Sequence, residues 1–274
     1  MQTQDVHLLS PSVAGASPTI DLAGTLYLPD DAASGEKAPG LVVGHGAGSR
    51  RSRHDQFCRE ACSAGFAVLG LDFRGHGDST GSADGPLELD LCAAAAFLRA
   101  QPSVDAEKVC YRGSSMGGFY GLKAAPQAGF AAVALLCPAT ESVILHALDE
   151  QEAMRDTEDP DSAGAAVSST GQRFPVAGDA PPRWDVPKLR EYFEQQQCLS
   201  IAALVECPVL FVHARADEVV PFTHTLLLTQ SLVVDTTLLA LAAGTHTTAQ
   251  HDPVIHRYTV DWLREQLISC SGRT

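Results

Sequence analysis

The chain alternates short, almost continuously apolar runs with longer segments in which apolar and polar residues mix. A strand that is apolar at nearly every position is buried on both faces of its sheet, which is typical of a parallel sheet between two layers of helices. We predict strands at the apolar runs 39–46, 66–73, 108–115, 130–139, 207–214 and 236–244.

The segments between these runs have the length and the Pro or Gly boundaries of helices. They span 51–65, 86–101, 116–127, 221–231 and 253–267. Because strand and helix alternate, the pattern predicts an α/β fold with a mostly parallel, doubly wound sheet. Before these units, "DVHLLS" at 5–10 and "IDLAGTLYLP" at 20–29 predict an antiparallel pair at one edge of the sheet.

One connection is longer than a crossover needs. About seventy residues separate the runs 130–139 and 207–214, whereas loops beyond about 15 residues without structure of their own are uncommon. We therefore predict a helical cap or lid insertion at 141–204, above the carboxyl ends of the strands. Residues 1–140 and 205–274 then form the core domain.

The charge, the apolar content and the cysteines of the chain limit its expected partners and location. The formal charge is −14, and Lys and Arg are scattered except for a short run at 50–53, which argues against nucleic acid. No stretch reaches the ~18 apolar residues that cross a membrane, and the polar first residues lack a signal pattern, so we expect a cytoplasmic protein. The eight cysteines stand singly, without a C-x-x-C pair, and are expected to be reduced and mostly buried.

Two stretches fit the pattern G-x-S-x-G, around Ser79 and around Ser115. A nucleophile elbow needs a strand that turns sharply into a helix, because the strained turn lifts the serine to the helix N-terminus. The stretch "KVCYRGSSMGGFYG" at 108–121 supplies that context for Ser115, whereas Ser79 lies in a loop and is expected to support a turn. Ser114 occupies the variable position of the motif and is expected to point away from the site.

Five motifs, one of which contains Ser115, follow one another along the chain. They are "VVGHGAG" (42–48), "LDFRGHGDS" (71–79), "GSSMGG" (113–118), "VHARADEVVP" (212–221) and "AGTHTT" (243–248). In content and order they resemble the landmarks of the α/β-hydrolase superfamily, over nearly the whole chain apart from the insertion. The resemblance implies the α/β-hydrolase fold and a triad in the order serine, acid, histidine.

The resemblance places the acid at Asp217 and the base at His246. Asp217 follows a strand in the family's G-x-x-D-x-x-V-P pattern, here with Ala214 in place of the glycine; Glu218 is adjacent but has the wrong spacing. The alternative for Asp217 is a carboxylate that only caps the next helix. The alternative to His246 is His251, which, like His256, is expected at the surface.

The remaining motif residues have expected supporting roles. The backbone N–H groups of Ala47 and Met116 would form the oxyanion hole, which stabilises the charge that develops on the carbonyl oxygen. His45 is expected to hold its loop, and His76 and His213 are expected to be structural. Asp72 and Arg74 should form a buried ion pair or brace a turn.

These residues imply acyl transfer to water through Ser115, His246 and Asp217, with no cofactor and no metal. A small-molecule acyl substrate is expected, with Phe119 and Trp184 as substrate-binding residues. Carboxylesterase is the first interpretation; thioesterase, acyl-peptidase and carbon–carbon bond hydrolase use the same triad, and a non-catalytic ligand-binding protein of this fold is the other class. The oligomeric state is open, with a dimer as one option.

Overall fold

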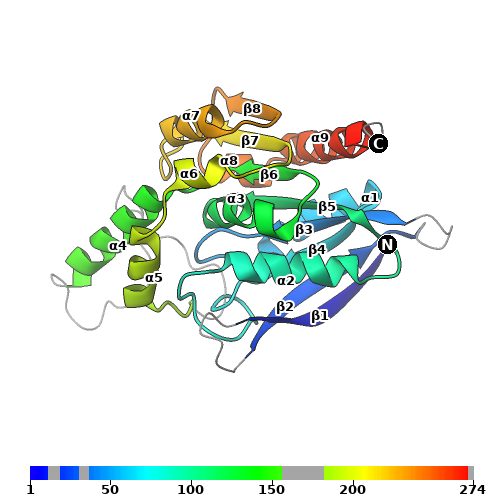
Figure 1. Ribbon diagram of the computed structural model, residues 1–274, viewed down its shortest axis with the longest axis horizontal. Helices are drawn as coiled ribbons and strands as arrows, with labels where there is room; N and C mark the ends of the chain where they lie inside the picture. The colour runs from blue at the N-terminus through cyan, green and yellow to red at the C-terminus, as the bar shows by residue number, and fades with distance from the viewer. Residues whose placement is uncertain (12–18, 31–36, 156–181, 271–274) are drawn as a thin grey trace.

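An eight-stranded sheet forms the centre of the computed structural model, which describes residues 1–11, 19–30, 37–155 and 182–270 (Figure 1). The strand order is β1-β2-β4-β3-β5-β6-β7-β8. The strands are β1 (Gln2–Ser10), β2 (Ile20–Leu28), β3 (Ala38–Gly44), β4 (Ala67–Leu71), β5 (Val104–Ser114), β6 (Val133–Leu136), β7 (Val209–Ala214) and β8 (Thr236–Leu241). Each predicted run contains a strand, so the fold prediction is confirmed.

The sheet is mostly parallel. β1 pairs with β2 and β2 with β4 in antiparallel register, while β4, β3, β5, β6, β7 and β8 run parallel to their neighbours. Register brings the carboxyl ends of the central strands to one edge: Ser114 pairs with Leu136, and Ala214 with Leu241. Loops that leave these ends share one rim, where open α/β sheets bind ligands.

Helices cover both faces of the sheet (Figure 1). They are α1 (Asp55–Ser63), α2 (Glu88–Arg99), α3 (Met116–Ala128), α7 (Phe222–Ser231), α8 (Thr248–His251) and α9 (Pro253–Cys270). Alternate strand residues belong to two core clusters: Val42 packs with the side chains of α2 and α3, whereas Leu41 and Val43 pack with those of α1 and α9. The period of two along a strand produces this division.

Some boundaries differ from the pattern. The segment 51–65 divides into a 3-10 turn, Arg51–His54, followed by α1. β5 begins at Val104, ahead of the predicted apolar run, and the pattern missed this start because several of the residues after Val104 are polar. A register shift in the pairing with β3 separates these residues from the apolar part of the strand. The four-residue helix α8 was not predicted, since four residues show no helical period.

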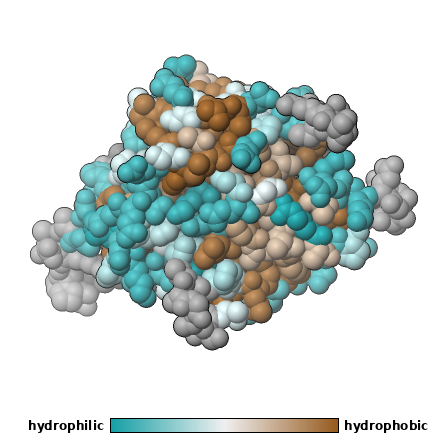
Figure 2. Space-filling model, viewed as in Figure 1, coloured by the Kyte–Doolittle hydropathy of each residue, from teal (hydrophilic) through white to brown (hydrophobic). Residues whose placement is uncertain are grey.

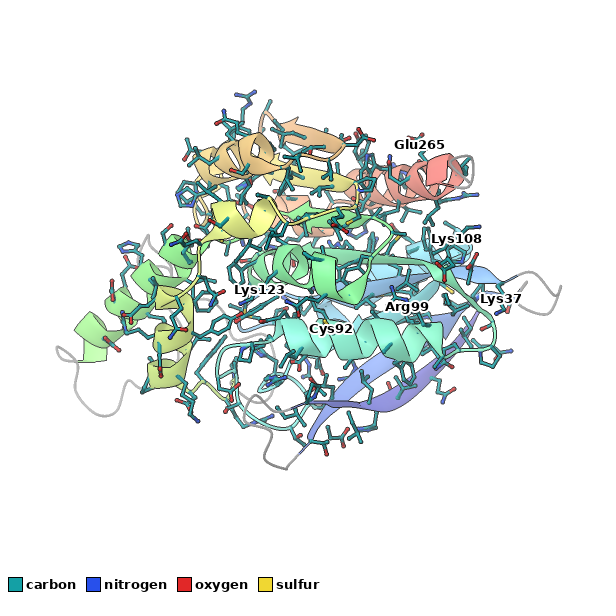
Figure 3. All side chains as sticks on the ribbon, viewed as in Figure 1. Lys37, Cys92, Arg99, Lys108, Lys123 and Glu265 are labelled. Atoms are coloured by element: carbon teal, nitrogen blue, oxygen red, sulfur yellow. The ribbon has the colours of Figure 1, made fainter. Side chains whose placement is uncertain are left out.

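The predicted insertion holds three described helices, α4 (Glu141–Arg155), α5 (Val186–Glu194) and α6 (Cys198–Ala202), which lie at one end of the sheet in Figure 1. Residues 156–181 of this insertion lie outside the described residues. Lys123 on α3 joins α2 to the segment after α5, with its Nζ 3.2 Å from Glu88 Oε1 and 2.5 Å from Gln196 Oε1 (Figure 3). That the insertion acts as a cap remains a prediction.

The surface is unevenly apolar. Figure 2 shows hydrophobic residues gathered over α7 and β8, where Leu227 and Val233 are exposed. Most of the described cysteines are buried, and Cys92 is partly exposed. Within the ranges that the structure describes, no helix has both the length and the apolar character to cross a membrane.

Candidate active site

Ser115 occupies a strained turn between β5 and α3. β5 ends at Ser114 and α3 begins at Met116, and Ser115 between them has φ 53° and ψ −117°. Few non-glycine residues adopt a positive φ, which costs about 1–3 kcal/mol and persists where the surroundings hold it. Here the Ser115 N–H donates to Leu136 O at 2.9 Å, and the Ser115 carbonyl accepts from Gly118 N at 2.9 Å.

Glycines let the loop after β3 approach this turn. A Cβ on Gly117 would lie 2.6 Å from the carbonyl oxygen of His45, and a Cβ on Gly46 would lie 3.3 Å from Ser115 Cβ. The first distance excludes a side chain at Gly117. The N-terminus of α3, where backbone N–H groups have no partner inside the helix, therefore lies against the loop that contains Ala47.

The other two serines have different surroundings. Ser79 is buried, its Oγ donates to Asp72 O at 2.6 Å, and it accepts from Ala23 N at 2.9 Å. Its hydroxyl thus supports a turn. Ser114 is fully buried, and its Oγ has no hydrogen-bond partner among the described residues.

Asp217 and His246 meet at the rim of the sheet. Asp217 lies in the loop between β7 and α7, and His246 in the loop between β8 and α8. Asp217 Oδ2 accepts from His246 Nδ1 at 2.8 Å, and Asp217 Oδ1 accepts from Val219 N and Val220 N, each at 2.8 Å. The N-cap of α7 is Pro221, so Asp217 does not cap that helix.

The two groups shift each other's protonation. Burial would raise the pKa of Asp217, but hydrogen bonds from His213 and His246 and the N–H of Val220 hold it well below its usual range. Burial would lower the pKa of His246, but Cys137 and Asp217 outweigh this and hold that pKa above its usual range. The site therefore favours the ionised form of Asp217 and the protonated form of His246.

Three contacts that the sequence did not indicate fix the backbone of His246. Its N–H donates to Glu218 Oε2 at 3.1 Å, and its carbonyl accepts from Gln250 Nε2 at 3.2 Å and from Cys137 Sγ at 3.4 Å. Cys137 directly follows β6 and has φ 40°. Ligand-type atoms of Cys137, Asp217 and His246 lie within 4.8 Å of one another, as a metal ion would require, and the Asp217–His246 hydrogen bond accounts for much of that closeness.

The alternative base, His251, is exposed, and its ring stacks on His54 with centroids 5.4 Å apart. The expectation that His256 lies at the surface was wrong. His256 is 3% exposed, since its Nδ1 lies 3.1 Å from Glu60 Oε2 and its Nε2 lies 3.1 Å from Gln250 O. A helix of mixed polarity can bury a polar side chain that finds hydrogen-bond partners inside the protein.

His45 braces the loop before Ala47. The His45 Nδ1–H donates to Gly46 O at 2.8 Å, and its Nε2 accepts from Phe73 N at 3.1 Å. Burial lowers the pKa of His45. Ala47 itself is exposed at the rim, and the participation of the Ala47 and Met116 N–H groups in an oxyanion hole remains a prediction.

Asp72 and Arg74 brace their turn through separate partners rather than through each other. Asp72 pairs with Arg51, whose N–H also donates to Asp72 Oδ1 at 2.6 Å. Arg74 is fully buried and pairs with Asp90 at 2.7 Å. Asp90 lies on α2, a placement that the motif alone does not reveal.

The two expected substrate-binding residues lie in different environments. Phe119 is 1% exposed, and its ring lies 5.0 Å from that of Phe193, so it joins α3 to α5. Trp184 is partly exposed and lies edge-on to His76, with ring centroids 4.8 Å apart. Substrate contact by either residue remains a prediction.

His213 has a contact that its structural interpretation did not include. It is fully buried, and its Nε2 lies 3.2 Å from Asp217 Oδ2. The sequence contained a signal for this, because a histidine at the end of a predicted strand lies four positions before the candidate acid.

Comparison with known proteins agrees with this architecture. The family model described as the alpha/beta hydrolase family matches residues 41–267. A solved structure of DcsB in complex with its substrate analogue is 19% identical, covers 98% of this chain and 99% of that one, and has a TM-score of 0.75. The Pyrococcus furiosus esterase PF2001 is 16% identical over 97% of this chain and 91% of that one, with a TM-score of 0.66.

Among curated proteins, the quorum-quenching protein AidA of Acinetobacter baumannii (strain MDR-ZJ06) is 36% identical over 110 residues. The match covers 38% of this chain and 36% of AidA. An uncharacterized protein of Mycobacterium tuberculosis, MT2364, is 25% identical over 73% of this chain and 59% of its own length. The chain thus spans less than two thirds of the curated relatives that it matches.

Proposed function

Because the chain belongs to the alpha/beta hydrolase family, we propose that it is a serine hydrolase that cleaves carboxylic esters through an acyl-enzyme on Ser115. The observation that carries the proposal is the 2.8 Å hydrogen bond between Asp217 and His246. It lies on the rim of the sheet where β5 turns through the strained Ser115 into α3.

In the proposed reaction the Ser115 hydroxyl attacks the ester carbonyl while His246 Nε2 takes the hydroxyl proton. Asp217 accepts from His246 Nδ1, which leaves Nε2 as the basic nitrogen, and it stabilises the imidazolium that forms. His246 then gives the proton to the leaving alcohol. A water molecule, deprotonated in the same way, releases the acid and restores Ser115.

The negative charge on the carbonyl oxygen would be met by the N–H groups of Met116 and Ala47. Met116 is the first residue of α3, so its N–H lies at the positive end of the helix dipole. Because Gly117 has no side chain, the loop after β3 can approach the start of α3, which places the segments of the two donors close together. Loss of one such donor typically costs about 10²–10³ in kcat.

We assign esters as the proposed substrate class because serine hydrolases of this fold with a plain triad most often act on them. The support from relatives is of the same kind: one structural neighbour is named an esterase, at 16% identity. The same triad on this fold can cleave oxygen esters, thioesters and amides, so the test compares all three classes.

The test is a panel of p-nitrophenyl esters of graded acyl length, together with an acyl-CoA and an aminoacyl anilide. Ser115→Ala serves as the background for each substrate. We expect ester turnover that exceeds this background by at least about 10³-fold. Thioester or anilide turnover without ester turnover would replace the ester assignment, and no Ser115-dependent turnover on any substrate would favour a binding protein.

A further inference from the structure

Asp217 is contacted by a second histidine besides His246. His213 lies in β7 and is fully buried. Its Nε2 is 3.2 Å from Asp217 Oδ2 and 3.0 Å from the carbonyl oxygen of Val220, while its Nδ1 is 2.7 Å from Thr225 Oγ1 on α7. The side chain thus lies between the candidate acid and the helix that follows it.

These partners fix the tautomer of His213. A carboxylate and a carbonyl oxygen both accept hydrogen bonds, so Nε2 must carry the proton. Nδ1 is then an acceptor, and the Thr225 hydroxyl donates to it. Both ring nitrogens of His213 are satisfied while the ring is neutral, which suits its full burial.

With His213 included, the carboxylate of Asp217 is surrounded by donors. Oδ1 accepts from two backbone N–H groups, those of Val219 and Val220, and Oδ2 accepts from His246 and His213. Two oxygens offer about four acceptor positions in total, so this set is complete. The carboxylate can neither rotate nor take up a proton without losing a hydrogen bond.

We propose that His213 is a positioning residue for the hydrolytic reaction, which holds Asp217 ionised and turned toward His246 through its Nε2–H, with Thr225 fixing the tautomer. The inference rests on the proposed function, since it concerns the acid of that triad. It assigns to a buried histidine a task in the reaction that packing alone would not require.

Removal of the His213 donor should change the pH dependence of kcat/KM. Without the His213 donor, more negative charge remains on Asp217 Oδ2, and this charge stabilises the protonated form of His246. The acidic limb of kcat/KM, where the base loses its proton, then moves to higher pH. A looser carboxylate also orients the imidazole less well, so kcat falls at every pH while KM changes little.

Other titratable groups face this cluster, and they remain in every variant below. Cys137 from the end of β6 and Glu218 from the loop after β7 contact the backbone of His246. His224 on α7 lies near His213, although its own bond is to Thr140 Oγ1 at 2.8 Å. Arg215 lies 5.4 Å from the ring of Phe222, which in turn lies edge-on to His213.

The first experiment compares His213→Leu with His213→Gln across a pH series. Leu removes the donor, whereas the Gln amide can still donate to Asp217. In His213→Leu we expect kcat to fall about tenfold or more, as for the loss of a hydrogen bond to a charged group, with KM within about twofold. The pH midpoint of the acidic limb of kcat/KM should rise by about half a pH unit or more in His213→Leu. In His213→Gln this midpoint should return toward the parent value.

Leu228→Ala is the matched control. Leu228 is fully buried on α7, one turn beyond Thr225, and its apolar side chain belongs to the hydrophobic core. Its truncation should lower the thermal midpoint and leave the acidic limb in place. If His213→Leu lowers the midpoint in the same way but leaves the limb unshifted, His213 is merely structural and the proposal is overturned.

A second pair decides the question if His213→Leu does not fold. Thr225→Val removes the hydroxyl at constant shape, and Thr225→Ser keeps it. Thr225→Val should shift the midpoint of the acidic limb or lower kcat, whereas Thr225→Ser should behave like the parent. If the two variants behave alike, the proposal is contradicted.

A readout without catalysis separates this inference from the proposed function. Nitrogen NMR of histidine-labelled protein should show His213 with a proton on Nε2 and none on Nδ1. A proton on Nδ1 would overturn the positioning role even in an active enzyme. Conversely, failure of the parent to label at Ser115 would refute the proposed function and leave the tautomer result standing.

Discussion

Nδ1 of His246 lies 2.8 Å from Oδ2 of Asp217, although 29 positions separate the two residues. β7 and β8 are neighbours in parallel register, so the loops that follow them meet at one rim. The Asp217 side chain accepts from the backbone N–H groups of Val219 and Val220. The backbone of His246 is held by the side chains of Glu218 and Gln250. The pair is therefore a fixed feature of the fold rather than a chance contact between mobile loops.

The first prediction concerns pH. A general base acts only when neutral, and the pKa of His246 is held above its usual range. The acidic limb of kcat/KM should therefore lie above pH ~6.5, the ordinary value of a histidine. A pH series of ester hydrolysis measures it; a limb below this value would show that the base is not the His246 described here.

The second prediction separates Asp217 from its neighbour Glu218. Asp217→Asn keeps the shape but replaces the anion, and kcat should fall by about 10³–10⁴-fold, with the acidic limb moving to lower pH. Glu218→Gln keeps an oxygen that can accept from the His246 N–H, and kcat should fall less than about tenfold. Steady-state kinetics of the two variants checks this, and the reverse ranking would move the acid to Glu218.

The third prediction concerns the close approach at the elbow. Gly117→Ala would place a Cβ 2.6 Å from the carbonyl of His45, forcing the loop away from α3. We expect a loss of about 1–3 kcal/mol in the free energy of unfolding, together with a fall in kcat as the predicted oxyanion donors separate. In Gly70→Ala, the control, the new Cβ has its nearest neighbour at 3.5 Å and should leave kcat unchanged.

The fourth prediction concerns acid stability. Arg112 is fully buried; its Nη1 lies 2.9 Å from His54 Nδ1 and its Nη2 donates to Gln250 O at 2.7 Å. Burial, and next the Arg112 charge, hold the pKa of His54 well below its usual range. His251 is exposed as a residue, but its ring stacks on His54, and desolvation of that ring followed by the Arg112 charge lowers its pKa to about 4. Their neutral forms are favoured by the fold, so the stability they contribute is present above pH ~6.5 and is lost as pH falls toward about 4.

His54→Asn tests this, because the Asn oxygen can accept from Arg112 without titrating. The free energy of unfolding from urea titrations at pH 7.5 and pH 5 should fall less between the two pH values in His54→Asn than in the parent. Equal falls in both proteins would mean that other groups account for the acid sensitivity.

The sequence predicted those features that one segment encodes by itself. The apolar runs gave the strands, because a strand buried on both faces has no polar side to mask its pattern. Strand and helix context also separated Ser79 from Ser115, and the structure has Ser79 bonded to the backbone of Asp72 and Ala23.

The features missed are contacts between distant segments. Arg74 pairs with Asp90, and Asp72 with Arg51, although Asp72 and Arg74 are near neighbours in their motif. His256 is buried because Glu60, 196 residues away, supplies its partner. Local patterns carry no information on which polar side chains the packing brings together, so buried polar networks were the weakest part of the prediction.

In the proposed reaction Ser115 is the nucleophile, and covalent labelling identifies the nucleophile by its position in the chain. A fluorophosphonate should react with the parent protein and with Ser114→Ala, and mass spectrometry of the digested adduct should locate the phosphonate on Ser115, while Ser115→Ala stays unlabelled. Labelling of Ser115→Ala at the parent rate, or an adduct on any other residue, would show that Ser115 is not the nucleophile.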